Sequence, residues 1–451
     1  MINIAFLNRL ASSRSDAEFA RISAGFGVLQ VYDSIKTTGF DPFVHQDALD
    51  RAAVEIAAMD PDTSLRAALE SVVQALPFWD SEQRARVGRR AVYTSLLVYG
   101  QALGDDGAWE IAETVYALVG MDAELDGETW LAAEARLLMG RASRMCADWE
   151  ASRIAYHRAY ELGLEAGDIS LALRSRIGEA NNLWSRGDFP AATRLLDATA
   201  RRARTSCPAV LPRVILAQAG VANAAGEYER AIHLTYGLIE SASDDDELKY
   251  QALVDLAIFL TDYGLPPIAA AALRVVERSA PERRIRRQAK LNLFFLAAQD
   301  NDEAAFEALR TELDAEPFTT REKTQFALFS ARGFRQFRRL DEAHAAVQRA
   351  IRLANQCQLF QLLFEAEAEL QTIERTLADQ SAAPTIAPAT AAESNDVPAA
   401  RNGRKESTAR YRPTSGVRLT PRMRRVAQSL ENMAASGLGE RDLQSSTALG
   451  E

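Results

Sequence analysis

The chain has 451 residues, of which 47% are hydrophobic and only 8% aromatic, and its formal net charge is -10. This length leaves room for several cores or for one long solenoid, and a composition rich in Ala, Leu, Arg and Glu favours an all-α fold. No apolar stretch is long enough to cross a membrane, and residues 1–10 lack the pattern of a signal peptide, so we expect a cytoplasmic protein.

The cysteines and the distribution of charge narrow the class of protein further. Cys146, Cys207 and Cys357 are scattered, with no second Cys at metal-ligand or redox spacing, so we expect reduced, buried thiols. Residues 401–425 carry nine Lys or Arg against one acid, a net charge of +8 that leaves -18 on the rest of the chain. The sequence therefore predicts an acidic body and a basic tail.

The N-terminal region, residues 1–80, is predicted to contain three helices. They cover residues 15–38, 43–58 and 63–76, and they are separated by Gly39-Phe40-Asp41-Pro42 and Asp60-Pro61-Asp62. We interpret this region as a helical cap or as one divergent repeat.

Residues 81–378 contain an internal repeat with a period of about 36–40 residues, as expected of a solenoid. The anchor of each unit is a small residue: Ala112, Ser152, Ala192, Ala231, Ala269, Ala305 and Ala343. Twelve residues earlier stand Gly100, Gly140, Ala180, Ala219, Ala257, Leu293 and Ala331. Apolar residues recur at helical spacing around each anchor, and turn residues fall midway, so each unit predicts a helical hairpin.

This pattern resembles the tetratricopeptide repeat (TPR), of a bacterial, long-period type. In that family a small residue on helix A lets helix B approach closely, an aromatic residue or leucine starts helix B, and an alanine followed by a large apolar residue packs the pair. The best match to the start of helix B is Arg339-Leu340-Asp341-Glu342-Ala343, followed by Val347. The resemblance implies an α-solenoid of about seven hairpins with a concave face. The unit that contains Leu293 and Asp302 is degenerate, which we interpret as a bend.

The C-terminal part of the chain is predicted to leave the solenoid. Residues 359–377 read as a capping helix, and residues 379–416 lack large apolar side chains and predict a disordered linker. Residues 417–451 form a short basic tail with one amphipathic helix near 419–433. Leu419-Thr420-Pro421-Arg422 is similar to the start of a LuxR-type helix-turn-helix, although too few residues follow for a recognition helix.

We find no catalytic constellation in the sequence. Phosphate-binding loops, zinc-binding His pairs, paired Cys and nucleophile elbows are all missing, and the four His stand singly. The acidic run over residues 244–247 precedes a helix, where carboxylates cap backbone amides, so we predict no metal site and no cofactor. We expect a binding protein and not an enzyme.

The TPR resemblance implies that helix A lines the concave groove, so candidate contacts are polar residues in register on that helix. Arg and Asn dominate these positions, and they suit the backbone and carboxylates of a bound segment. The candidate partner-binding residues are Arg141, Arg144, Arg174, Asn181, Trp184, Arg213, Asn223, Arg332 and Arg335. The alternative interpretation is a set of solvated surface charges.

These patterns support one leading function and one alternative. The leading hypothesis is an adaptor or regulatory scaffold that binds another protein or peptide, with an anionic segment as one option. In the alternative, a transcription-linked regulator contacts nucleic acid or RNA polymerase through its basic tail. Two further basic clusters would extend a nucleic-acid-binding surface only if they shared one face of the protein. They are Arg201, Arg202 and Arg204, and the run from Arg283 to Lys290.

Overall fold

The computed structural model describes residues 3–13, 16–60, 63–80, 85–241, 246–316, 318–356, 359–382 and 421–436. Within these ranges the chain forms twenty α-helices, two short 3-10 helices and no strand, which confirms the predicted all-α fold. None of the described helices is both long enough and apolar enough to span a membrane.

The N-terminal region contains four helices where the sequence indicated three. The additional helix, α1, is short and carries no capping signal, but its Phe6 is fully buried and packs against Phe26 with ring centroids 5.8 Å apart. Tertiary contact therefore stabilises α1. The elements are α1 (Asn3–Ser12), α2 (Asp16–Thr38), α3 (Pro42–Ala57), α4 (Ser64–Ala75) and the 3-10 turn η1 (Leu76–Phe78).

The predicted hairpins follow, and among the described residues there are seven of them. The first four are α5 (Ala85–Asp105) with α6 (Trp109–Leu125), α7 (Thr129–Met145) with α8 (Trp149–Glu165), α9 (Ile169–Ser185) with α10 (Phe189–Ser206), and, after the turn η2 (Pro208–Val210), α11 (Leu211–Ala224) with α12 (Tyr228–Ser241). The last three are α13 (Asp246–Asp262) with α14 (Pro266–Ser279), α15 (Arg283–Gln299) with α16 (Glu303–Asp314), and α17 (Thr320–Gln336) with α18 (Leu340–Gln356).

A left-handed residue ends the first helix of every hairpin. The residue that follows it donates its backbone N–H to the carbonyl five positions before that following residue, at 2.8–3.0 Å, which is the Schellman motif. Four of these positions are Gly, as predicted, because Gly adopts a positive φ without strain. The residues are Gly107, Ala147, Gly187, Gly226, Gly264, Asn301 and Arg338.

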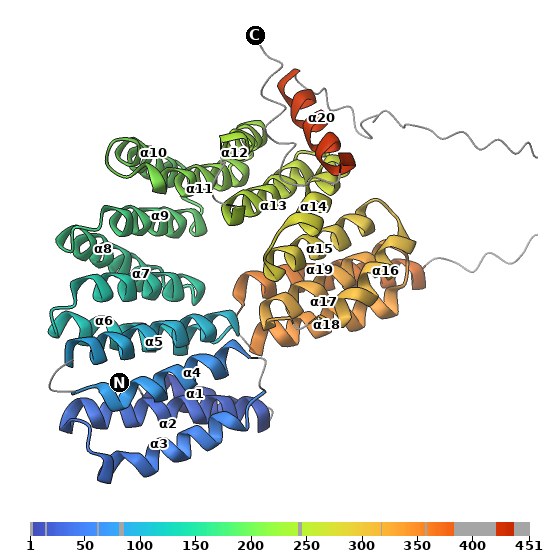
Figure 1. Ribbon diagram of the computed structural model, residues 1–451. Coiled ribbons are helices and arrows are strands. Elements are labelled where there is room, and N and C mark those ends of the chain that lie inside the picture. The colour runs from blue at the N-terminus through green and yellow to red at the C-terminus, as the bar shows by residue number, and fades with distance from the viewer. Residues whose placement is uncertain are drawn as a thin grey trace, which may run out of the picture.

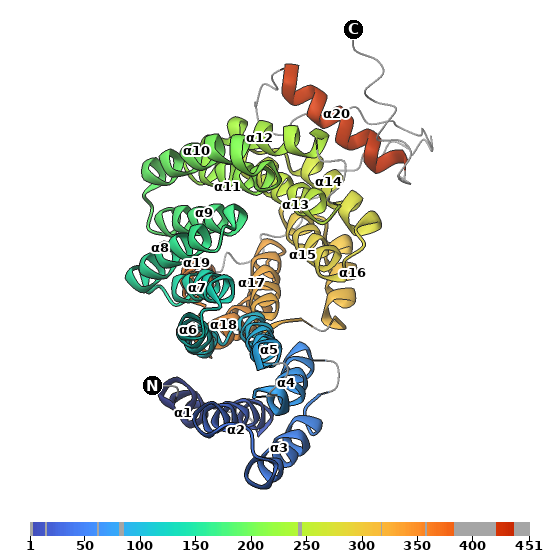
Figure 2. The same cartoon turned by 60° about the vertical axis from the view of Figure 1, so that its left-hand side comes forward.

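The hairpins stack into a superhelix with two layers. Figure 2 shows the odd-numbered helices α5 to α17 on the inside of the curve and the even-numbered helices α6 to α16 on the outside. The small residues on the inner helices make this close packing possible. A Cβ added at Gly178 would lie 2.2 Å from the ring of Tyr156, and one at Gly140 would lie 2.7 Å from the same ring.

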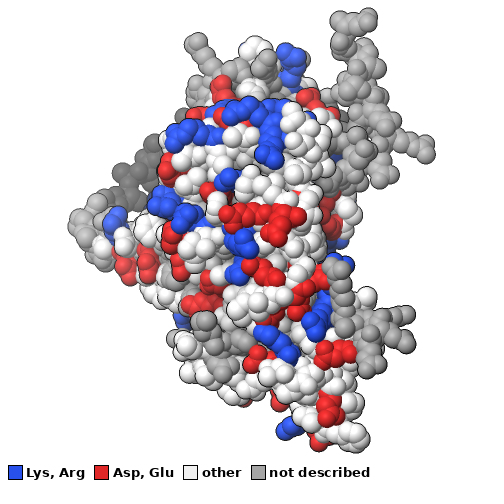
Figure 3. Space-filling view, turned by 90° about the vertical axis from the view of Figure 1, so that its left-hand side faces the viewer, with Lys and Arg blue, Asp and Glu red and all other residues white. Residues whose placement is uncertain are grey.

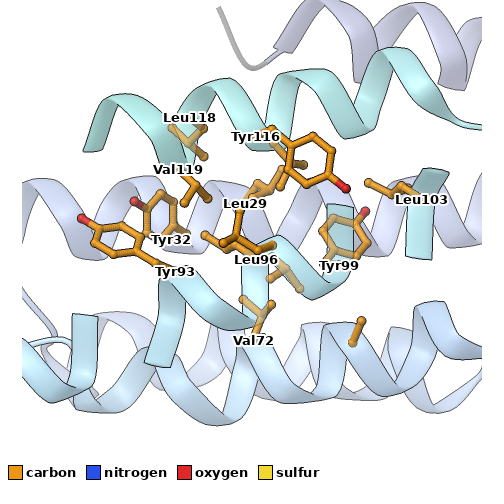
Figure 4. Close-up of a cluster of buried hydrophobic side chains, with 14 of the residues drawn as sticks. Leu29, Tyr32, Val72, Tyr93, Leu96, Tyr99, Leu103, Tyr116, Leu118 and Val119 are labelled. Carbon is orange, nitrogen blue, oxygen red and sulfur yellow. The ribbon is translucent and has the colours of Figure 1, made fainter. Parts of the chain in front are cut away.

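The N-terminal helices share a continuous core with the first hairpins. Figure 4 shows Tyr32 of α2 beside Tyr93 of α5, with their hydroxyl groups pointing the same way. Tyr32 donates to the buried carboxylate of Asp122 at 2.6 Å, and Tyr93 donates to Asp126 at 2.7 Å. These contacts fix the cap against α6.

The stacking changes at the degenerate unit, α15–α16. Elsewhere the outer helix of a hairpin packs on the next inner helix, but here α17 packs mainly on α15. Aromatic rings pack together in this unit. The ring centroids of Phe294 and Phe306 lie 4.4 Å apart, and the ring of Phe306 lies against Gly333 of α17. The last hairpin is covered by α19 (Phe360–Ala382), at the predicted position and slightly longer than expected.

The final helix, α20 (Pro421–Ser436), lies on the outer side of the solenoid, beside α14 (Figure 1). Its apolar stripe of Met423, Val426 and Leu430 is at most 2% exposed and joins the core of α12 to α15. Arg278 of α14 donates to the carbonyl of Ala434 at 3.1 Å. The predicted linker beyond residue 382 lies outside the described residues.

Candidate functional site

All nine candidate partner-binding residues lie on inner helices, namely α7, α9, α11 and α17. The first three helices are neighbours in the stack, while α17 belongs to the last hairpin. Figure 2 places α17 across the curve from α7, because the superhelix turns back on itself. The candidate residues therefore belong to inner helices from two distant parts of the sequence.

Three of the candidate arginines are engaged with carboxylates of a neighbouring helix. Arg174 donates to both oxygens of Glu134, at 3.0 and 2.9 Å. Arg332 donates to Glu365 at 3.2 Å, and Arg335 donates to Glu369. Each pair spans about one repeat, so these guanidinium groups hold consecutive units together.

The two asparagines and the tryptophan lie in the middle of the inner layer. Asn223 donates to Asp262 at 2.7 Å, whereas its side-chain oxygen is buried without a partner among the described residues. Trp184 packs on the next inner helix, where a Cβ at Gly220 would lie 3.1 Å from its ring. Asn181 is half-buried, and its side-chain amide forms no hydrogen bond within the described part of the chain.

Polar pairs separated by one repeat recur along the whole inner layer. They were not predicted, although the sequence contains their signal: an acid about one period away from an Arg or Trp. The further pairs are Arg90 with Glu128 at 2.6 Å, Trp130 with Asp168 at 2.8 Å, Arg284 with Glu247 at 3.4 Å, and Arg287 with Glu322 at 2.9 Å.

The remaining candidates, Arg141, Arg144 and Arg213, have no ion pair with any described residue. Arg141 lies over the ring of Trp109, 5.5 Å from its centroid, which fixes the guanidinium without neutralising it. Arg144 lies 3.5 Å from the hydroxyl of Ser185. Arg213 is exposed near the start of α11. Among the nine candidates, these three guanidinium groups have no carboxylate partner within the described part of the chain.

A further arginine, Arg321 in the first turn of α17, joins this group. Burial lowers the pKa of the Arg321 guanidinium, and the like charges of Arg141 and Arg144 lower it further, while Glu365 opposes them. Arg321 is half-buried and has no ion pair within the described ranges. No sequence pattern could indicate this electrostatic coupling, because α7 and α17 belong to hairpins far apart in the sequence.

The same approach of distant units is visible at the end of α5. Burial raises the pKa of the Asp105 carboxyl, and Arg141 and Arg284 of α15 counter this effect. Burial also raises the pKa of Asp106, against the charges of Arg21 and Lys323 of α17. The inner ends of α15 and α17 therefore lie close to the first hairpins.

The basic cluster that begins α15 is largely neutralised. Arg283 pairs with Glu316 at 3.0 Å and Lys290 with Glu312 at 3.0 Å, around a hollow of about 520 Å³. The cluster on α10 differs, since its side chains are exposed. Its members are Arg194, Arg201, Arg202 and Arg204. Figure 3 shows a band of Lys and Arg across the upper part of that outer face, with acids below it.

The structure also places the groups considered for chemistry. Burial raises the pKa of the Cys146 thiol to about 12, Cys207 is half-buried, and Cys357 lies outside the described residues. In the described ranges no three His, Cys, Asp or Glu side chains gather as metal ligands would. The predicted acidic run falls partly outside these ranges, with α13 starting at Asp246.

The basic tail is described only over α20. The predicted amphipathic helix is present, and its apolar stripe faces the solenoid while Arg424 and Arg425 are exposed. Because α20 packs on the outer side, it does not occupy the inner layer. The LuxR-like similarity covers Leu419-Thr420-Pro421-Arg422, and its first two residues lie outside the described residues.

No protein-family model and no curated protein sequence matches the chain. Among solved structures, similarity is found to a Rap protein complexed with competence and sporulation factor (12% identity, TM-score 0.44, covering 80% of this chain and 99% of that one). The apo form of RapI is similar at 11% identity (TM-score 0.42, covering 77% and 98%). The TPR domain of P58(IPK) is similar at 16% identity (TM-score 0.25, covering 79% and 99%).

These similarities are too distant to assign a partner to this chain. Its own repeat geometry is decisive for the architecture: seven described hairpins, a left-handed residue in each turn and small residues beneath the rings of the neighbouring helix. The chain is a TPR-like, all-helical repeat protein.

Proposed function

We propose that this chain is a non-catalytic adaptor or regulatory scaffold whose inner layer binds a segment of another protein. The observation that carries the proposal is the set of open polar groups on consecutive inner helices: Arg141 and Arg144 on α7, Asn181 on α9 and Arg213 on α11. Amide and guanidinium groups in register can bond the backbone and the acidic groups of an extended or helical segment.

The inner-layer proposal is tested with a double variant, Asn181→Ala with Arg213→Ala, in affinity capture followed by mass spectrometry. Asn181 is half-buried, Arg213 is exposed, and neither has an ion pair in the described part of the chain, so the fold should be retained. The matched control is Asn432→Ala with Arg202→Ala, which changes the same residue types on the outer side. Specific partners should be lost from the inner variant alone; unchanged capture of every partner would refute the proposal.

A second candidate function is a transcription-linked regulator that contacts nucleic acid through its basic tail. The observation that favours it is the exposure of Arg424 and Arg425 on α20, whose apolar side is already covered by α14. Binding through phosphates would weaken steeply with salt. Duplex DNA binding at low salt that disappears when residues 401–451 are deleted would support this function, and no binding at low salt would remove it.

A further inference from the structure

We propose that the outer face of α10 binds the phosphate backbone of a nucleic acid. This surface, the α10 ridge, consists of four exposed arginines: Arg194, Arg201, Arg202 and Arg204. It lies in the outer layer of the solenoid, so it is separate from the inner layer to which the proposed function assigns a protein segment. It also differs from the basic tail, whose helix α20 packs on α14.

The helical geometry of α10 turns these side chains toward solvent. Leu196 and Ala203 are fully buried and mark the side of α10 that packs on the solenoid. At about 3.6 residues per turn, Arg194 and Arg201 lie opposite that side, on one line and about 10 Å apart along the axis. The other two arginines flank this line, one on each side. The four guanidinium groups therefore project outward from one helix.

The arginines of the α10 ridge are not paired with acids, unlike those of the adjacent outer helices. Residues 185–241 are described without a gap, and within the described chain none of the four has an ion pair. Asp197, the single acid of α10, instead accepts a hydrogen bond from Gln218 of α11 at 2.7 Å. On α8 and α12 each Arg is paired. The pairs are Arg153 with Glu150 at 2.6 Å, Arg158 with Glu124 at 3.1 Å, and Arg230 with Glu227 at 2.7 Å.

The stability of α10 accounts for only part of this charge. A cation in the last turn of a helix is stabilised by the helix dipole, and Arg204 stands there. Arg194 is the sixth of eighteen residues, and the dipole effect does not extend so far from the C-terminus. The chain as a whole has a net charge of -10, so the ridge reverses the overall sign locally. Figure 3 shows the resulting band of Lys and Arg on the outer face.

The surface of α10 lacks the apolar groups that a protein or a membrane would bury. Large exposed apolar side chains occur elsewhere, such as Phe43 on α3 and Ile154 on α8, but none of those in the described ranges lies on α10. Protein interfaces are anchored by such side chains, and helices at a membrane surface insert them. Nucleic-acid interfaces are more polar and strongly positive. The make-up of the ridge therefore favours a nucleic acid.

The length of the ridge suits a duplex backbone. Residues 194–204 extend about 15 Å along α10, and duplex DNA carries about nine phosphate charges over the same length of its axis. A guanidinium group can donate two hydrogen bonds to one phosphate, so each Arg of the ridge can hold one. Contacts of this kind position a protein on the backbone without reading the bases. We therefore expect binding that is independent of sequence.

The test is fluorescence anisotropy of a labelled DNA duplex of arbitrary sequence, titrated with the full chain over a series of NaCl concentrations. Each neutralised phosphate contributes about -0.9 to the slope of log K against log salt. Arg194→Gln with Arg201→Gln should weaken binding and make that slope shallower by about 2. Arg194→Lys with Arg201→Lys should keep the slope, because a phosphate contact requires the charge. The matched control, Arg349→Gln with Arg352→Gln, removes two exposed charges from α18 and should leave binding unchanged.

Three results would overturn the α10 ridge. They are no duplex binding at low salt, binding that is unchanged by Arg194→Gln with Arg201→Gln, and binding that is lost in the lysine variant although its thermal unfolding is that of the natural chain. Polyglutamate should compete with the duplex poorly at equal charge concentration; equal competition would reassign the ridge to an acidic polypeptide. The same titration with an RNA duplex distinguishes the two kinds of backbone, and the proposal requires that at least one of them binds.

Deletion of residues 401–451 separates the ridge from the basic tail. Binding that survives this deletion and depends on Arg194 and Arg201 supports the ridge. Binding that depends on the tail and not on these two arginines supports the second candidate function and overturns the ridge. The inner-layer proposal is tested by protein capture, which is read after nuclease treatment, so it stands or fails independently of the ridge.

Discussion

Truncation of Leu430 on α20 is expected to release this helix from the solenoid without unfolding the repeats. Leu430 is fully buried, and with Met423 and Val426 it forms the stripe that packs on α14. A buried Leu→Ala substitution costs about 2–5 kcal/mol in a closed core. Here the cost is limited to the free energy that docks α20, because no further contact is lost once the helix has detached.

The assay is hydrogen exchange read by mass spectrometry on peptides from α20 and from the repeats. A loss of about 2 kcal/mol in docking raises the open population of α20 about 30-fold, and exchange there should rise by a similar factor. Peptides from α6 to α10 should not change. Leu196→Ala in α10, another fully buried leucine, is the matched control and should lower the stability of the repeats themselves.

Two results would refute a separately docked α20. In the first, Leu430→Ala lowers the denaturation midpoint of the repeats as much as Leu196→Ala does. In the second, exchange in α20 is already fast in the natural chain, since the stripe would then not be docked. The expected result would establish α20 as a separable element on the outer side of the solenoid.

Three further predictions concern the repeats. The Ala147→Gly substitution should raise the free energy of unfolding by about 0.5–1 kcal/mol in chemical denaturation. Ala147 has a φ of 60°, which strains a residue with a side chain, and glycine removes that strain at some cost in backbone entropy. A destabilised variant would contradict this prediction. Gly178→Ala should destabilise the chain by about 1–3 kcal/mol, since the new Cβ would lie 2.2 Å from the ring of Tyr156; a stabilised variant would show that the ring can move freely. Burial raises the pKa of Asp255 to about 6, so the native chain loses stability as the pH rises from about 4 through 6. The Asp255→Asn variant should therefore be more stable than the natural chain by about 1–3 kcal/mol above that pH range and by little below it. An equal gain in stability at all pH values would argue against burial as the cause.

Much of the architecture could be predicted because repeats make it a local problem. The turns at Gly107, Gly187 and Gly226 follow from the need for a left-handed residue, and the small residues of helix A follow from close helix packing. Ala147 and Arg338 take the same conformation without any sequence signal, since the Schellman hydrogen bonds of the hairpin impose it. Helix α1 escaped prediction for a related reason, because only its burial stabilises it.

The sequence by itself thus determined the class of fold, the number and period of the hairpins and the helix faces that carry Arg and Asn. Only the tertiary structure decided which of those side chains are open. Arg174 and Arg332 are engaged by acids about one repeat away, whereas Arg141 and Arg144 have no ion pair with any described residue, and their charges act on Arg321 of the last hairpin. The reason is physical: helix periodicity fixes neighbours within a few tens of residues, but the small rotation between successive units, summed over the superhelix, decides which distant units meet.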